Sequence, residues 1–133
     1  MSKSLYSTSF NTKFIELITK LTVLFPDNDT IGIALSSYIS AKKINPTIAI
    51  KLWHQYVSKY YDIIYSGNIN YFLDKDFTED VSNLDQKTAK QVLTMIDDSV
   101  RTPMKSLCGT DLNICTEFVI SLCKLAEKYD SMN

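Results

Sequence analysis

Residues 45–67 have the sequence NPTIAIKLWHQYVSKYYDIIYSG, in which apolar side chains recur at the three- and four-residue steps of an α-helix. Asn45 and Pro46 mark its start, because asparagine caps helices and proline loses no hydrogen bond at the first helical position. Gly67 marks its end, since glycine readily adopts the left-handed conformation that closes many helices. Apolar residues cover more than one face. We therefore expect a long central helix over about residues 46–65 that contacts several neighbours.

The segments on both sides of this helix show the same helical spacing. Two amphipathic helices are expected before it, at about residues 10–25 and 29–44, and two after it, at about residues 84–101 and 110–129. A short aromatic and helical segment is expected at about residues 69–77. No stretch alternates apolar and polar residues long enough to predict a strand. The chain is therefore predicted to be all-α, a single compact bundle of five to six helices with a long central third helix.

Length and composition indicate one folded domain. The chain has 133 residues, of which 45% are apolar and 22% charged, and its formal net charge is -1. Residues 10–130 are predicted to form the domain and the serine-rich residues 1–9 a disordered tail. No run of about 18 apolar residues predicts a membrane span. Three cysteines without a secretory leader, Cys108, Cys115 and Cys123, indicate an intracellular protein whose thiols pack in the core.

The sequence does not indicate catalytic chemistry. His54 is the single histidine, and the residues three and four positions away, Ile50, Lys51, Val57 and Ser58, include no carboxylate to orient it. A nucleophile, a base and an orienting group are not visible together. With three glycines, the chain also lacks a glycine-rich phosphate loop. We expect a protein that is not an enzyme and needs no cofactor.

An acidic connector after the third helix has the spacing of a calcium-binding loop. Counted from Asp74, oxygen-bearing side chains include those of Asp76, Thr78, Asp80 and Asp85, at positions that carry ligands in a twelve-residue EF-hand loop. The match is incomplete, because position 6 lacks the usual glycine and Asp85 is shorter than the usual glutamate. A solvated connector that caps the neighbouring helices explains the same residues, so no metal site is predicted.

Aromatic residues are more numerous than a small core is expected to bury. The chain has eight tyrosines, six phenylalanines and one tryptophan. Tyrosine joins apolar area to a polar tip and is favoured at protein interfaces. We predict a surface for a protein partner from five residues of the third helix and the following segment, Trp53, Tyr60, Tyr61, Tyr71 and Phe72. Packing within the core, or within a homodimer, is the alternative use of these side chains.

Lysines near the third helix support a second function of another class. Lys42, Lys43, Lys51 and Lys59 are the best candidates for a basic patch, and neighbouring tyrosines offer rings on which bases stack. The single arginine, Arg101, argues against sequence-specific reading of DNA, because arginine makes the bidentate contacts to guanine. The sequence therefore predicts a non-catalytic interaction or structural module, with accessory nucleic-acid binding as the alternative.

A set of short, spaced motifs resembles small helical proteins encoded by large nucleocytoplasmic DNA viruses of algae and protists. The motifs are LFPDND at 24–29, NP at 45–46, LW at 52–53, YY at 60–61, GN at 67–68 and YFLDKDF at 71–77. They span roughly residues 21–80 and include no catalytic signature. The resemblance implies a viral protein located in the cytoplasm of the infected cell or in the virion, and it assigns no functional residue.

Overall fold

The computed structural model describes residues 2–75 and 86–132, and every regular element in these ranges is helical. The elements are α1 (Lys3–Leu24), α2 (Asp29–Ile44), α3 (Ile48–Val57), the 3₁₀ turn η1 (Ser58–Tyr60), α4 (Tyr61–Tyr65), α5 (Ile69–Asp74), α7 (Gln86–Ile96), the π-helical turn η2 (Asp97–Arg101), α8 (Thr102–Met104) and α9 (Gly109–Ser131). The predicted all-α class is confirmed. Within the same ranges, no helix combines the length and apolar character that crossing a bilayer requires.

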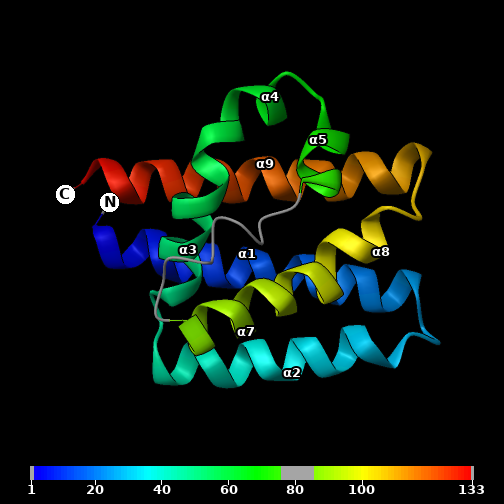
Figure 1. Cartoon of the computed structure of the whole chain (residues 1–133), viewed down its shortest axis with the longest axis horizontal. Coiled ribbons are helices and arrows are strands. Elements are labelled where there is room, and N and C mark those ends of the chain that lie inside the picture. Colours follow the sequence, from blue (N-terminus) through cyan, green and yellow to red (C-terminus); the bar gives the residue numbers. More distant parts are fainter. Residues whose placement is uncertain (1, 76–85, 133) are drawn as a thin grey trace.

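The helices form a compact bundle built around α1. Figure 1 shows α1 and α9 side by side and antiparallel, so that both ends of the chain lie at the same end of the bundle. Helix α2 returns along α1, and α7 with η2 packs against α2. Helix α3 crosses the others steeply and leads to α4 and α5, which lie at the opposite edge of the view from α2. This arrangement separates the α2 face of the molecule from the α4–α5 face.

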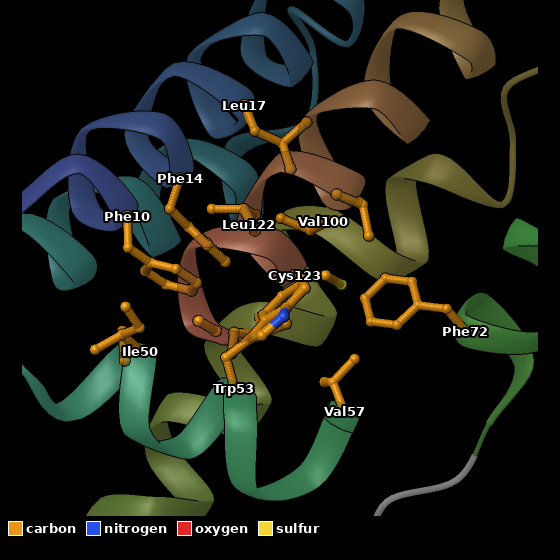
Figure 2. Close-up of a cluster of buried hydrophobic side chains, with 14 of the residues drawn as sticks. Phe10, Phe14, Leu17, Ile50, Trp53, Val57, Phe72, Val100, Leu122 and Cys123 are labelled. Carbon is orange, nitrogen blue, oxygen red and sulfur yellow. The ribbon is translucent and has the colours of Figure 1, made fainter. Parts of the chain in front are cut away.

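Aromatic rings fill the centre of the bundle. The Trp53 ring lies edge-on to Phe10 and Phe14, with centroids 5.8 and 6.0 Å apart, and its centroid is 5.5 Å from that of Phe72. Phe14 also stacks on Tyr38 at 4.7 Å. Figure 2 shows these side chains converging from α1, α3 and α5 on the aliphatic residues of α9 and η2. Much of the aromatic content of the chain is therefore core.

The predicted disordered tail over residues 1–9 is wrong, because α1 begins at Lys3. The hydroxyl side chains of this segment form local hydrogen bonds within the helix. The Ser2 side-chain oxygen accepts the Leu5 N–H at 3.4 Å, and the Thr8 hydroxyl donates to the Ser4 carbonyl at 2.9 Å. Tertiary contact adds to this, since the Lys3 ammonium lies 4.7 Å from the centre of the Tyr129 ring of α9. The helical domain thus starts earlier than residue 10.

The third helix is central but shorter than predicted. Asn45 ends α2, and its side-chain oxygen accepts the N–H of Thr47 at 3.4 Å, so α3 begins at Ile48 rather than at Pro46. After ten residues the chain tightens into η1. Because a 3₁₀ turn has about 3.0 residues per turn instead of 3.6, it rotates the following side chains away from the faces that α3 would continue. Six of the ten α3 residues are buried, which agrees with a central position.

Other boundaries follow the sequence pattern with two exceptions, of which the first is that the helix expected over residues 69–77 ends at Asp74. The predicted helix over residues 29–44 is confirmed, and Gly67 has the expected left-handed conformation with φ of 100°. The helix expected to end near residue 101 continues through Pro103 as far as Met104. Proline is tolerated there because it lies in the first turn of α8, where its missing N–H leaves few bonds unmade.

Two of the three cysteines are core residues, as predicted. Cys115 and Cys123 are buried, and burial raises the pKa of the Cys123 thiol to about 12. Cys108 is exposed, which corrects the expectation that it packs in the core. It precedes the first residue of α9, at the N-terminal end that emerges from the bundle.

Candidate functional site

Three of the five residues predicted for a partner surface belong to the core. Trp53 is 1% exposed, and Tyr61 and Phe72 are buried with it. They lie on the sides of α3, α4 and α5 that neighbouring helices cover, so they do not contribute to a surface of the single chain. Tyr71 is 41% exposed and Tyr60 is half-buried. The aromatic surface expected from the sequence is therefore reduced to these two tyrosines.

Tyr60 and Tyr71 form a pair of rings at the α4–α5 edge of the molecule. Their centroids are 5.3 Å apart and their planes are tilted by 48°. The Lys75 ammonium lies 5.5 Å from the centre of the Tyr60 ring, within range of a cation–π contact. Two aromatic rings and a cation, from η1 and from α5 with its C-cap, thus meet where one ring is open to solvent.

Local sequence explains how the two rings meet. Gly67 closes α4 in a Schellman motif, in which its N–H donates to the Ile64 carbonyl and the Asn68 N–H donates to the Ile63 carbonyl. This turn sends α5 back along the bundle. In α5 the buried residues are Ile69, Phe72 and Leu73, which share one face, so Tyr71 falls on the opposite face. Its exposure follows directly from helical periodicity.

Arg101 anchors the end of α5 that carries Tyr71. Its side chain is buried at 7% exposure and donates to three backbone carbonyls: Nε to Phe72 at 3.1 Å, and Nη2 to Leu73 at 3.2 Å and to Lys75. The opposite side of the guanidinium pairs with the Asp97 carboxylate at 2.7 Å. Because cations stabilise the free carbonyls at helix C-termini, this contact holds the last turn of α5 in place. Sequence reasoning treated Arg101 only as a sign of arginine scarcity and missed this role.

A second polar cluster joins α3 and α4 to α9. His54 Nε2 lies 3.2 Å from the Asp130 carboxylate, and His54 Nδ1 lies 3.0 Å from the Tyr61 hydroxyl. Burial raises the pKa of Tyr61 above its ordinary value, so the phenol stays protonated at neutral pH and donates to Nδ1 when Nε2–H bonds to Asp130. Nearby, the Tyr65 hydroxyl donates to Glu127 at 3.4 Å.

The histidine cluster resembles an orienting pair for a general base, but its geometry favours a structural link. The oxygen that His54 would activate belongs to Tyr61, which is buried, so a substrate would have to reach into the packed core. The pair also fastens α3 to the last turns of α9, which lie 76 positions further along the sequence. Helical neighbours of His54 gave no signal for Asp130, because the contact is purely tertiary.

The four lysines of the alternative site lie along the chain from the end of α2 to η1. Lys43, Lys51 and Lys59 are exposed and Lys42 is half-buried. Lys51 and Lys59 are eight residues apart, which corresponds to about 12 Å along a helix. Lys42 and Lys43 belong to α2, Lys51 to α3 and Lys59 to η1, where it precedes Tyr60.

Of the residues named for the calcium-loop pattern, one lies within the part of the chain that the structure describes. Asp74 is exposed at the end of α5, whereas Asp76, Thr78, Asp80 and Asp85 lie outside the described residues. Among the residues that are described, no group of three histidine, cysteine, aspartate or glutamate side chains is arranged to hold a metal ion.

Comparison of the chain with protein-family models, curated proteins and solved structures finds no match.

Proposed function

We propose that this protein is a non-catalytic interaction module that contacts a protein partner through the tyrosine pair, defined as Tyr60 and Tyr71 together with Lys75. The observation that carries the proposal is the meeting of two rings, 5.3 Å apart, at a place where Tyr71 is 41% exposed. Tyrosine gives a large contact area at a low cost in conformational entropy, and such residues dominate binding energy at interfaces.

Rigid support of the pair strengthens this proposal. Arg101 fixes the last turn of α5, and the Schellman turn at Gly67 fixes its first turn. A pre-ordered surface loses less side-chain freedom on binding, so more of its contact energy appears as affinity. The partner surface that fits this chemistry offers an apolar or aromatic recess for Tyr71 and a carboxylate near Lys75.

Accessory nucleic-acid binding is the second candidate. It is favoured by one observation, the position of Lys75 over the Tyr60 ring with the exposed Lys59 adjacent in sequence. Exposed rings flanked by lysines are the elements of a stacking platform for single-stranded nucleic acid. The exposed Lys43 of α2 and Lys51 of α3 would add further contacts to a phosphate backbone.

The place of action that we propose follows from the motif resemblance given above. A module of a large DNA virus would act in the cytoplasm of the infected cell or within the virion. Its partner would then be another viral protein or a host protein.

A pull-down with matched variants tests the proposed function. The tagged protein, the double variant Y60A/Y71A and the control Y6A, which removes a half-buried tyrosine of α1, are compared in extracts of the native cells with and without nuclease. We expect partners that resist nuclease, are retained by Y6A and are reduced about tenfold or more by Y60A/Y71A. Partners that disappear with nuclease and with moderate salt would favour nucleic-acid binding. Retention of every partner by Y60A/Y71A would refute both roles for the tyrosine pair.

A further inference from the structure

The solvent face of α2 exposes two large aliphatic side chains. Ile33 is 67% exposed and Ile44 is 86% exposed. Between them on the outer side of the helix lie the exposed serines Ser37 and Ser40, and residues 30–41 include no charged side chain. Single exposed aliphatic residues are common on protein surfaces, and these two matter here because they lie on the same side of one helix.

Helical geometry places the two isoleucines on one line. They are eleven residues apart, which is about three turns and about 16 Å along the axis. Ser37 and Ser40 lie near the middle of that line, and their small side chains allow another helix to approach closely. The face therefore has one isoleucine at each end and small residues at its centre.

A groove opens beside this face, between α2 and α7. It has a volume of about 600 Å³ and its lining includes Ile33, Ala34, Ser37, Val92 and Met95. An isoleucine from a second molecule that lies over Ile33 would also cover the apolar lining of this groove. The apolar area open to a partner thus extends beyond the two exposed isoleucines.

The charges at the two ends of α2 indicate which kind of helix packs on this face. Asp27 and Asp29 lie at its N-terminal end, and the exposed Lys43 lies in its last turn. Lys42 is nine residues from Ile33 and therefore lies on the opposite side of the helix. A parallel neighbour would bring like charges together, whereas an antiparallel copy of the same helix brings each acidic end toward a basic end. The helix dipoles are then also antiparallel. The surface is complementary to itself under a two-fold rotation, which is the condition for an isologous dimer.

We propose that the chain forms a symmetric homodimer through antiparallel packing of α2 against α2 of a second copy. Ile33 of each copy lies opposite Ile44 of the other, and Ser37 lies opposite Ser40. A single helix face gives a small interface, below about 1,200 Å² in total, which is the size class of weak and transient complexes.

The dimer does not depend on the proposed function, but it determines how many tyrosine pairs one particle presents. In Figure 1 α2 lies at the edge of the molecule opposite α4 and α5. A dimer formed through α2 therefore leaves the tyrosine pair of each copy open and presents two pairs at once. Two linked sites bind a repetitive partner with an avidity that exceeds the affinity of one site.

Sedimentation velocity of the full chain over roughly 5–500 µM tests the dimer, a range suited to a weak complex. We expect the wild type to convert from monomer to dimer across this range. The double variant I33D/I44D should weaken the association by about tenfold or more, because each substitution buries a charge in the contact. The control V23D adds a charge at an equally exposed position on α1, 70% exposed, and should dimerise like the wild type.

A charge-swap experiment distinguishes α2 pairing from non-specific association. The variants K43E and D27K/D29K should each associate more weakly alone, and an equimolar mixture should restore dimerisation as a heterodimer. Circular dichroism of each variant checks that the helices are retained. A wild type that stays monomeric at the highest concentration, an equal loss in V23D, a mixture without recovery or a mass above that of a dimer would each overturn the proposal.

Discussion

Replacing Arg101 by methionine removes the cation that holds the end of α5 while keeping a long side chain in the same space. The wild-type guanidinium is buried and donates to the carbonyls of Phe72, Leu73 and Lys75 and to the Asp97 carboxylate. Hydrogen bonds to charged groups contribute about 1.5–3 kcal/mol each, and buried acceptors left without donors cost about 1–3 kcal/mol. Since these contributions are not additive and water reaches the exposed side of the site, we expect R101M to lose about 3 kcal/mol of unfolding free energy.

Urea and thermal unfolding measure this loss. For a chain of this size, about 3 kcal/mol corresponds to a melting temperature about 10 °C lower. The control is K105M, which removes one positive charge from an exposed position one turn further along and should change the unfolding free energy by less than about 0.5 kcal/mol. An R101M protein as stable as K105M would refute the anchoring role of Arg101. Weaker partner binding by R101M at a temperature where it remains folded is the expected second readout, because Tyr71 loses its support.

Three further predictions follow from burial and backbone geometry. W53A should lower the unfolding free energy measured in urea by about 3–5 kcal/mol, because it leaves a cavity among the aromatic rings of the core, whereas Y71A should lower it by less than about 1 kcal/mol. Equal losses would contradict the assignment of Trp53 to the core and Tyr71 to the surface. G67A should lose about 1–2 kcal/mol because its φ is 100°, while G32A, whose added methyl meets no atom within 4 Å, should gain up to about 1 kcal/mol in the same assay. Burial raises the pKa of Tyr38 above its ordinary value near 10, so its contribution to the unfolding free energy is complete below pH 10. Above pH 10 this contribution falls by up to about 1.4 kcal/mol per pH unit. Y38F should therefore reduce the loss of unfolding free energy that urea unfolding measures between about pH 8 and 11, and an unchanged slope would contradict this prediction.

Helix positions were largely predictable from the sequence because they depend on residues a few positions apart. The helix over residues 29–44, the left-handed Gly67 and the absence of an alternating strand pattern all follow from local spacing and turn chemistry. Errors occurred where local signals were ambiguous. Hydroxyl side chains at the N-terminus are compatible with a tail or with a capped helix, and packing of α1 on α9 selected the helix.

Burial of individual aromatic residues was not predictable in the same way. Trp53 and Tyr71 have similar sequence surroundings, rich in apolar and aromatic residues, yet one is at the centre of the core and the other is open to solvent. The difference depends on which helix covers each face, and that depends on how α3, η1 and α5 turn in space. The surface expected from the sequence was accordingly too large.

The sequence alone determined the helical class and most helix positions, because backbone hydrogen bonding and side-chain periodicity act over three or four residues. Only the tertiary structure decided that His54 meets Asp130, that Arg101 holds the end of α5, and that the uncharged face of α2 stays open. Each of these depends on side chains brought together, or left apart, by packing between helices. Such packing minimises exposed apolar area over the whole chain at once, so no local segment encodes it.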